Sequence, residues 1–381
     1  MLNKNIIMPD YKNSIMNITV SILKYYGAET QHSSITEIDS ILHKNYKNVV
    51  LLILDGMGSD ILDYHLPENS LFRKHKIKDI TSVYPSTTPV AMTSINSGLS
   101  PLEHGWIGWN CYFKESNQEL ELFMNKDFYS HKQAPTSNFV NSIIGYEFIN
   151  SQISRSTQKK VAAYEVPPPF RPDGVKSTSE MFSRIKELCQ SDEKKFIYAY
   201  WDDPDATMHA IGTRSEEITG IIKRINNELS DTLPYLKDTL IILTADHGMI
   251  DIKEHVFLND IAELDECLNA LPSLNNRAMS FKVKSDKKDI FEKRFNACFK
   301  DSHLLLDKKQ FIKLLGPGIP HRKINDFVGD FVALAVGNKM LQYRALEHQG
   351  YSWMKASHAG LTRAEMIVPL IIIECPYVKG T

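Results

Sequence analysis

The sequence has few cysteines, and they form no pattern. Its five cysteines are Cys111, Cys189, Cys267, Cys298 and Cys375, and no two of them stand in a Cys-x-x-Cys pair. An odd number of scattered cysteines does not indicate a disulfide framework or a structural zinc–thiolate site. We therefore expect reduced thiols in a cytoplasmic protein.

The sequence also lacks segments that would direct it into a membrane. No stretch approaches ~18 uncharged apolar residues, so we expect no transmembrane helix. Residues 1–28 contain no uninterrupted apolar core followed by a small-residue cleavage site, so we expect no secretory signal. The net charge of −2 argues against broad binding to a nucleic acid polymer, but it leaves small phosphorylated substrates open.

Five short apolar runs recur along the chain, and each ends in polar or turn residues. They are residues 48–56, 159–166, 194–203, 238–248 and 365–375. Continuous runs of this kind are typical of strands that are covered on both faces, as in a parallel sheet. Helical patterns lie between them, notably at 177–190 and 215–237. The alternation predicts an α/β fold with a mostly parallel central sheet flanked by helices.

Residues 258–350 differ from the rest of the chain. The chain has 381 residues, more than the roughly 250 residues that usually share one hydrophobic core. A second domain or an inserted subdomain is therefore expected. This segment suggests strands and helices in turn, and we predict that it is a smaller α+β cap. The cap would be inserted into a catalytic domain made of residues 1–257 and 351–381. A second irregular segment, 109–140, is rich in aromatic residues and has little periodicity.

Acidic residues and histidines stand where the predicted strands end, the place where such sheets bind ligands. Asp205 and His209 are four residues apart, so on a helix they share one face and can hold one metal ion. Asp246 and His247 are adjacent, and both reach a site only if the backbone turns there. An acidic helix start would also explain the first pair, and a solvated strand end the second.

Two further residues complete a candidate metal site. Asp55 ends the first strand in "LILDGMG", and His358 precedes the last strand in "SHAGLT". Alone, Asp55 is also explained as a helix cap and His358 as a polar loop residue. Six ligands and one oxygen nucleophile suffice for two ions roughly 4 Å apart, which clamp the attacking and leaving oxygens at phosphorus. Mixed carboxylate and imidazole ligation favours Zn²⁺, with Mn²⁺ as the alternative.

The segment "SVYPSTTPVAMTSINSGLSP", residues 82–101, carries candidate nucleophiles. A hydroxyl group becomes a competent nucleophile when a metal ion lowers its pKa. Thr88 and Pro89 predict an N-cap followed by proline at the first helical position. The positive end of that helix would lie beside an incoming phosphate. A capped turn with no further role is the alternative.

Taken in order, these motifs resemble the alkaline phosphatase superfamily, specifically its type I phosphodiesterase/nucleotide pyrophosphatase branch. The resemblance rests on "LDGMG", "YPSTTPVAMTSINSGLSPLEHG", "DDPDATMHAIG", "TADHGM" and "SHAGLT", which span residues 51–360. It implies an alkaline phosphatase-like fold and two metal sites, one with the ligands Asp205, His209 and His358 and the other with Asp55, Asp246 and His247.

The resemblance also implies roles for residues outside the metal ligands. Thr88 would be the nucleophile and bridge both ions, with Thr87 as the second candidate. Asn110 would donate a hydrogen bond to a nonbridging phosphate oxygen, a contact worth ~3 kcal/mol in the transition state.

The sequence departs from the nucleotide-hydrolysing members of the branch after the nucleophile. Pro89 and Ala91 stand where those members usually have an aromatic residue and an asparagine. Arg171 is a candidate for binding a phosphate or carboxylate, although a surface loop would also place it. A substitute aromatic wall could come from nearby residues, although aromatic residues are more often core. The candidates are Trp106, Trp109, Tyr112, Phe113, Tyr164 and Phe170.

The sequence therefore predicts a two-metal hydrolase that cleaves phosphodiester or phosphoanhydride bonds through Thr88 and a phospho-threonine intermediate. The expected partner is a small phosphorylated substrate, a nucleotide or another phosphodiester. A phosphonate hydrolase, a phosphomonoesterase and a metal-dependent phosphomutase are alternatives on the same scaffold. A catalytically idle interaction module is the alternative from another class.

Overall fold

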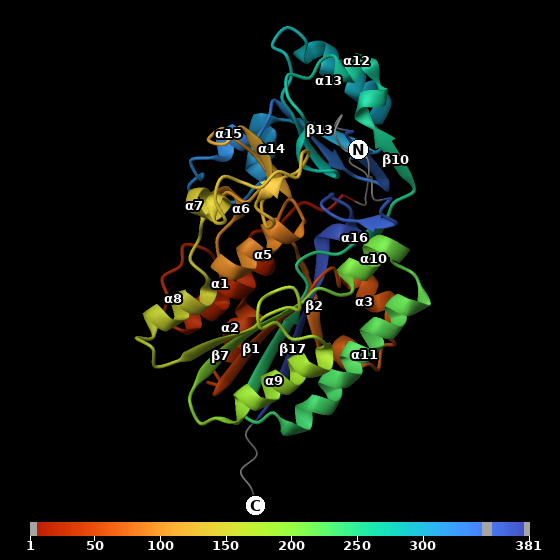
Figure 1. Ribbon diagram of the computed structural model, residues 1–381. Coiled ribbons are helices and arrows are strands. Elements are labelled where there is room, and N and C mark those ends of the chain that lie inside the picture. The colour runs from red at the N-terminus through yellow and green to blue at the C-terminus, as the bar shows by residue number, and fades with distance from the viewer. Residues whose placement is uncertain (1–5, 345–352, 377–381) are drawn as a thin grey trace, which may run out of the picture.

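Two β-sheets organise the chain, a six-stranded sheet and a seven-stranded sheet, at opposite ends of the view in Figure 1. The computed structural model describes residues 6–344 and 353–376. The six-stranded sheet has the order β2-β17-β8-β1-β7-β6, and the seven-stranded sheet has the order β13-β14-β12-β11-β3-β4-β5.

The six-stranded sheet is mixed, with a parallel centre. Strands β6, β7, β1 and β8 pair in parallel, and every residue of β1, β7 and β8 is buried. Burial on both faces explains their nearly continuous apolar sequences. The predicted α/β architecture is confirmed. The strand bounds are β1 (Asn48–Leu54), β2 (Lys76–Thr81), β6 (Ala162–Val166), β7 (Lys195–Trp201), β8 (Thr239–Thr244) and β17 (Ile367–Cys375).

Strand β17 runs antiparallel to both of its neighbours, β8 and β2. Its last residue, Cys375, pairs with Thr239 at the start of β8. The start of β17 therefore lies at the edge where the parallel strands end, and the loop before it reaches that edge. Its apolar run was consistent with a parallel strand, but burial produces the same run in either direction.

Helices cover the six-stranded sheet in two groups, which Figure 1 shows on its two flanks. The first group is α1 (Ile15–Tyr25), α2 (Thr36–Leu42), α5 (Thr88–Ser97) and α8 (Ile149–Ser156). The second is α3 (Ser59–His65), α4 (Leu71–Lys74), α9 (Thr178–Gln190) and α11 (Glu216–Thr232). In α11, Ser215 accepts a hydrogen bond from the backbone N–H of Ile218, and the isoleucine stripe is buried. The helix predicted at 215–237 is confirmed in its main part.

The seven-stranded sheet is antiparallel and combines two distant segments of the chain. It takes β3 (Asn110–Phe113), β4 (Gln118–Glu121) and β5 (Lys126–Asp127) from the segment in which the sequence shows little periodicity. Its other strands are β11 (Ser273–Asn275), β12 (Ala278–Phe281), β13 (His303–Asp307) and β14 (Phe331–Ala335). The helices beside it are α12 (Ala262–Asp265), α13 (Lys288–Phe299), α14 (Lys308–Leu314) and α15 (Ile324–Phe327). The predicted cap boundaries stay a prediction, and residues 345–350 of that cap lie outside the described residues.

Further short helices complete the described fold. They are α6 (Pro101–His104), α7 (Phe139–Ile144), α10 (Asp205–Ile211), α16 (Arg363–Met366), η1 (Leu233–Tyr235) and η2 (Leu258–Asp260). Two small sheets pair β10 (Glu254–Phe257) with β15 (Lys339–Gln342), and β9 (Ile250–Asp251) with β16 (Ala356–Ser357). One large hydrophobic core surrounds the six-stranded sheet, and two smaller cores flank the other. Within the described ranges, no helix is both long and apolar enough to cross a lipid bilayer.

Candidate active site

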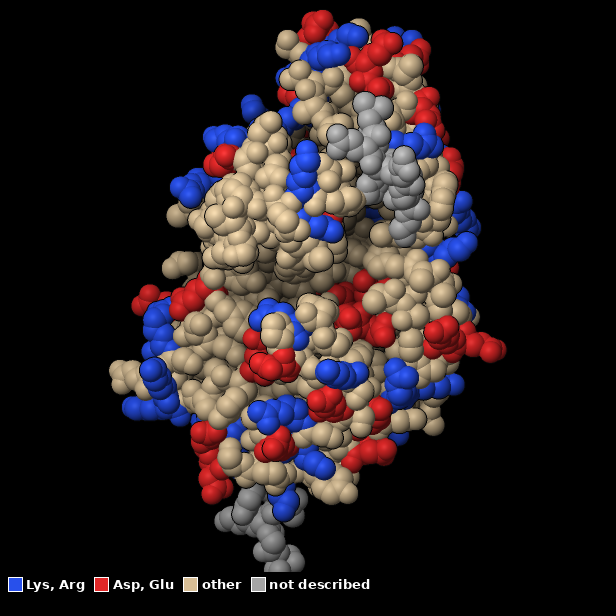
Figure 2. All heavy atoms as spheres, viewed as in Figure 1, with Lys and Arg blue, Asp and Glu red and all other residues tan. Residues whose placement is uncertain are grey.

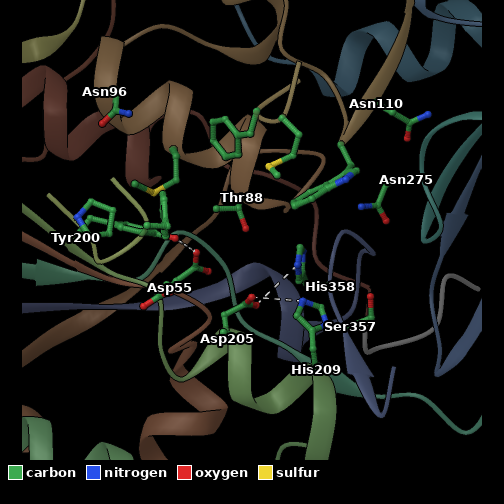
Figure 3. A pocket seen from close by; sticks show the side chains of 18 of the residues that line it. Asp55, Thr88, Asn96, Asn110, Tyr200, Asp205, His209, Asn275, Ser357 and His358 are labelled. Carbon is green, nitrogen blue, oxygen red and sulfur yellow. Dashed lines mark hydrogen bonds and ion pairs between the residues drawn. The ribbon is translucent and has the colours of Figure 1, made fainter. Parts of the chain in front are cut away.

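The candidate metal ligands come together at the edge where the parallel strands end. Asp55 follows β1, and Asp246 and His247 follow β8. Asp205 is the first residue of α10, after β7, and His358 follows β16 in the loop that leads to β17. Figure 3 shows Asp55, Asp205, His209 and His358 pointing toward one another below Thr88.

Asp205, His209 and His358 form one potential metal site. The Nε2 atom of His209 lies 3.3 Å from Asp205 Oδ2, and that of His358 lies 3.8 Å from Asp205 Oδ1. The spacing of four residues places Asp205 and His209 on one face of α10, as predicted.

Asp55, Asp205 and His247 form a second potential site, and Asp246 lies against it. His247 Nε2 lies 3.5 Å from Asp55 Oδ1 and 3.2 Å from Asp246 Oδ2. Strand β8 ends at Thr244, and the backbone N–H of His247 donates to Asp246 Oδ1 at 2.9 Å. The backbone thus turns after β8, which allows both adjacent side chains to face the same site.

Each histidine has one ring nitrogen fixed by a backbone carbonyl. The Nδ1 atoms of His209, His247 and His358 lie 2.8, 3.0 and 3.1 Å from the carbonyl oxygens of Ala356, Gly248 and Ser86. A carbonyl oxygen only accepts, so Nδ1 carries the proton and the Nε2 lone pair faces the carboxylates. This is the arrangement in which a protein holds a metal-ligating imidazole.

Each carboxylate of the site has one buried oxygen without a hydrogen-bond partner in the described structure: Asp55 Oδ1, Asp205 Oδ1 and Asp246 Oδ2. Two of the other oxygens are fixed. Tyr200 donates its hydroxyl to Asp55 Oδ2, and the backbone N–H of Gly56 donates to Asp246 Oδ1 at 3.1 Å. Buried polar atoms are rarely left unpaired, so these oxygens fit metal coordination.

Electrostatics gives the same result. Burial raises the pKa of Asp55, and the carboxylates of Asp246 and Asp205 raise it further. Burial also raises the pKa of Asp246, although His247 opposes it. Burial also disfavours ionised Asp205, but His209 and the other histidines outweigh it and lower the pKa of that carboxyl. With three carboxylates ionised and Thr88 deprotonated, the site carries four negative charges. Two divalent cations would balance them, and this oxygen and nitrogen donor set suits Zn²⁺ or Mn²⁺.

Thr88 lies beside these groups, with its Oγ1 atom 3.1 Å from His247 Nε2. The N-cap of α5 is Thr87, which has extended backbone angles, and Thr88 is the first helical residue. The predicted N-cap is therefore wrong by one residue, because the helix begins at Thr88 itself. Thr88 lines the cavity described next, whereas Thr87 has no exposed surface.

A cavity of about 880 Å³ opens from the metal ligands toward the seven-stranded sheet. Figure 2 shows the surface hollowed between the two ends of the molecule, with acidic side chains gathered on one side of the hollow. The wall of the cavity is rich in aromatic residues and methionines. Among the described lining residues, Arg171 is the one lysine or arginine. The aromatic residues are Trp109, Phe123, Phe128, Tyr146, Phe148, Phe170, Tyr198 and Tyr200.

The structure separates the residues predicted to bind substrate. Phe170 and Arg171 line the cavity, and Phe170 is 67% exposed. Trp106 and Tyr164 are not among the described residues that line it. The indole N–H of Trp106 donates to the carbonyl of Ile144 at 2.7 Å inside a hydrophobic core. Tyr164 points out of β6, and its hydroxyl donates to Glu193.

Asn110 and Asn275 both line the cavity, from neighbouring strands of the seven-stranded sheet. The Asn110 amide nitrogen donates to Glu119 Oε1 at 2.8 Å, and burial raises the pKa of Glu119. In Figure 3, Asn275 lies between Asn110 and His358.

Sequence reasoning did not find Asn275 or the two tyrosines of β7. Tyr198 and Tyr200 are two residues apart, and the alternation of side chains along a strand places both on one face. From the sequence, that alternation could have predicted that the two tyrosines lie on the same face of the sheet. Asn275 belongs to a three-residue strand and carried no such signal.

Comparison with known proteins gives a family match over most of the chain. The model of the family described as type I phosphodiesterase/nucleotide pyrophosphatase matches residues 49–359. The bis(5'-adenosyl)-triphosphatase enpp4 of Mus musculus is 23% identical over 235 residues, covering 58% of this chain and 50% of the relative. The chain thus spans about half the length of the curated relatives it matches.

Two solved structures share the fold. An inactive variant of murine ectonucleotide pyrophosphatase/phosphodiesterase 5, in complex with AMP, has a TM-score of 0.61 at 18% identity and covers 84% of this chain and 87% of that one. The phosphonoacetate hydrolase of Sinorhizobium meliloti 1021, in complex with phosphonoformate, has a TM-score of 0.59 at 17% identity and covers 87% and 90%.

Proposed function

This chain belongs to the type I phosphodiesterase/nucleotide pyrophosphatase family, and from that premise we propose that it is a two-metal hydrolase of phosphodiester or phosphoanhydride bonds. One observation carries the proposal: three unpaired carboxylate oxygens, three anchored imidazoles and the Thr88 hydroxyl meet at one strand edge. Three buried carboxylate oxygens left unpaired in one cluster are unusual for a purely structural site.

We assign the metal ligands to the two sets that the family resemblance implies. Asp205, His209 and His358 would hold one cation, and Asp55, Asp246 and His247 the other. When bound, two divalent cations lower the pKa of a hydroxyl group and neutralise charge at phosphorus. We propose zinc from the ligand types, with manganese as the alternative.

The reaction takes place in two displacements. Thr88 loses its proton to solvent, and its Oγ1 atom attacks phosphorus in line. A bond forms from Thr88 to phosphorus, and the bond to the leaving oxygen breaks; that oxygen takes a proton from water. Water then cleaves the phospho-threonine, which releases a phosphate monoester and restores Thr88. At the start of α5, Pro89 has no N–H, and the N–H groups of Val90 and Ala91 donate to the Thr87 carbonyl. The N–H of Thr88 is therefore the one in this turn that we propose to meet the phosphate.

The cavity indicates the kind of substrate. Its aromatic and methionine-rich wall favours a phosphodiester or anhydride with a planar or apolar substituent, such as a nucleotide. The aromatic residue absent at position 89 would be replaced by Trp109, Phe170 and their neighbours. Arg171 alone offers a positive charge among the described lining residues, which disfavours a small polyanion such as phosphonoacetate. A cytoplasmic location stays a prediction.

The test uses metal-loaded protein and bis(p-nitrophenyl) phosphate. We expect Thr88→Ala to lose turnover by about 10³-fold or more while it retains two metals per chain by elemental analysis. Thr87→Ala, which removes the neighbouring hydroxyl, should keep hydrolysing the diester. Full activity of Thr88→Ala would rule out the assigned nucleophile.

A substrate panel separates the alternatives. Rates on an aryl diester, an aryl monoester and phosphonoacetate distinguish a phosphodiesterase from a monoesterase and a phosphonate hydrolase. Isomerised product without free phosphate would indicate a mutase. A protein that takes up no metal would be the idle interaction module.

A further inference from the structure

The seven-stranded sheet places the side-chain amide of Asn275 next to the segment that carries Thr88. Asn275 ends β11, lines the cavity together with Thr88, and is half-buried. Its Nδ2 atom lies 3.5 Å from the hydroxyl of Thr87, the residue before Thr88. No other described residue supplies a hydrogen-bond acceptor to that nitrogen, so one of its two N–H bonds is free for a ligand.

The orientation of this amide is fixed from the opposite side. The backbone N–H of Arg277 donates to Asn275 Oδ1 at 2.9 Å, which turns the Nδ2 end toward Thr87 and the cavity. Arg277 is itself held, because its guanidinium pairs with buried Glu365 at 2.6 and 2.8 Å and donates to two backbone carbonyls. A fixed donor needs no reorganisation during the reaction, which is the condition for strong transition-state stabilisation.

The backbone before Asn275 is strained. Leu274 has φ of +76°, in the left-handed region that a bulky residue rarely adopts. A Cβ atom on Gly108 would lie 2.6 Å from the Leu274 Cα atom, so glycine permits this close approach. The carbonyl of Leu274 also accepts a hydrogen bond from the N–H of Trp109. Strain of this kind is held where the surrounding structure needs a side chain in one place.

Asn110 also has one amide N–H engaged, but in a closer hydrogen bond than that of Asn275. It donates to Glu119 at 2.8 Å, and both side chains are almost fully buried. Moving the Asn110 nitrogen to a substrate would leave Glu119 buried without its donor, which is costly.

We propose that Asn275, rather than Asn110, donates the side-chain hydrogen bond to a nonbridging oxygen of the reacting phosphate. The inference rests on the proposed phosphodiesterase function and assigns one contact within it. It also makes the seven-stranded sheet part of the catalytic site, because β11 belongs to that sheet.

The experiment compares Asn275→Ala, Asn275→Asp and Asn110→Ala in the zinc-loaded full chain, with Asn269→Ala as a matched control on the exposed surface of the same region. Asn275→Asp keeps the Oδ1 acceptor for the Arg277 N–H but replaces the donor by a negative charge, whereas Asn275→Ala removes the donor and the acceptor without adding charge. We expect both Asn275 variants to lower kcat for bis(p-nitrophenyl) phosphate by about 10²- to 10³-fold, with KM changed only a few-fold and two metals retained. Asn110→Ala should lose less kcat but melt at a lower temperature.

Orthovanadate gives a second readout that does not depend on turnover. Calorimetric binding of orthovanadate, a mimic of the pentacoordinate phosphorus, should weaken in the Asn275 variants by a similar factor. A larger kcat loss in Asn110→Ala, or unchanged kcat and vanadate affinity in both Asn275 variants, would overturn the assignment. If the wild type hydrolyses no diester, the proposed function fails, and the vanadate comparison still decides the contact.

Discussion

Tyr200 shows how single residues prepare the site. Its hydroxyl donates to one oxygen of Asp55, and the other oxygen stays free and faces His247. A similar division recurs in the three histidines of the site, where Nδ1 is bound to the backbone and Nε2 faces the carboxylates or Thr88. Ala359 adds strain beside His358, with φ of +93°. These anchors fix the ligand atoms before a cation arrives, which reduces the ordering cost of binding it.

Glu119 gives a residue-scale prediction about pH. Burial raises the pKa of this carboxyl in the folded protein above its unfolded value. Its contribution to stability is therefore full below the unfolded pKa and is lost as pH rises through the folded pKa. We expect Glu119→Gln to raise the melting temperature at pH 8 by a few degrees, and to change it little near pH 4.

Thermal melts of both proteins from pH 4 to pH 9 check this. Gln keeps the acceptor for the Asn110 amide, so the substitution removes only the titrating group. The prediction is wrong if Glu119→Gln lowers the melting temperature equally at every pH.

At the scale of elements, the sequence predicted those strands and helices that a local pattern of apolar residues or a residue spacing indicates. The apolar runs that end near Asp55 and Asp246 correspond to β1 and β8. The four-residue spacing of Asp205 and His209 corresponds to one face of α10. The sequence did not indicate the direction of β17, because burial selects apolar residues in parallel and antiparallel strands alike. Nor did it indicate the pairing of Leu274 with Asn110, since a short strand joining distant segments has no period of its own. Trp106 lies in a hydrophobic core, and composition alone does not tell which aromatic residues are core.

The Arg277–Glu365 ion pair joins the seven-stranded sheet to the loop that carries His358. Arg277 directly precedes β12 of that sheet. Glu365 accepts hydrogen bonds from Arg277, from the Gly360 N–H and from the Thr362 hydroxyl, and neither charged side chain is exposed. The Gly360 carbonyl in turn accepts from Ser86. The pair therefore fixes the loops on both sides of the site.

We expect Arg277→Met to lower the free energy of unfolding by roughly 3–5 kcal/mol, because Glu365 is left as an uncompensated buried charge. The loop bearing His358 should loosen as well, and the metal content should fall below two per chain. Urea unfolding and elemental analysis measure both effects.

The double variant Arg277→Met/Glu365→Gln is the control. It removes both charges, so its loss of stability should be clearly smaller than the sum of the two single losses. Additive losses with two metals retained in Arg277→Met would show that the pair does not link the sheet to the site.

At the scale of the whole molecule, the cavity lies between the two sheets and uses both. The six-stranded sheet supplies the acidic and imidazole groups, and the seven-stranded sheet and its neighbours supply Asn110, Asn275 and part of the aromatic wall. Figure 2 shows this hollow opening to solvent between the two ends of the molecule. The proposed substrate wall is therefore built from both sheets, whereas the candidate metal ligands gather at the edge of the six-stranded sheet.

Metal removal should destabilise the whole molecule. A ligand that binds only the folded state adds about 2.7 kcal/mol at a hundredfold excess over its Kd. We therefore expect EDTA to lower the melting temperature at pH 8 and zinc to restore it. Because burial raises the pKa values of Asp55 and Asp246, protons compete with a cation for these carboxylates, and we expect cation binding to release protons. The stabilisation by zinc should consequently shrink as pH falls from 8 to 5.

Asp205→Asn tests whether this effect comes from the candidate site, because Asp205 contributes to both ligand clusters. Its melting temperature should respond to zinc far less than that of the wild type, whereas Thr88→Ala should keep most of the response. Calorimetric zinc titration at two buffer ionisation enthalpies counts the protons released. Equal zinc responses in Asp205→Asn and the wild type, with no protons released, would place the bound metal elsewhere on the molecule.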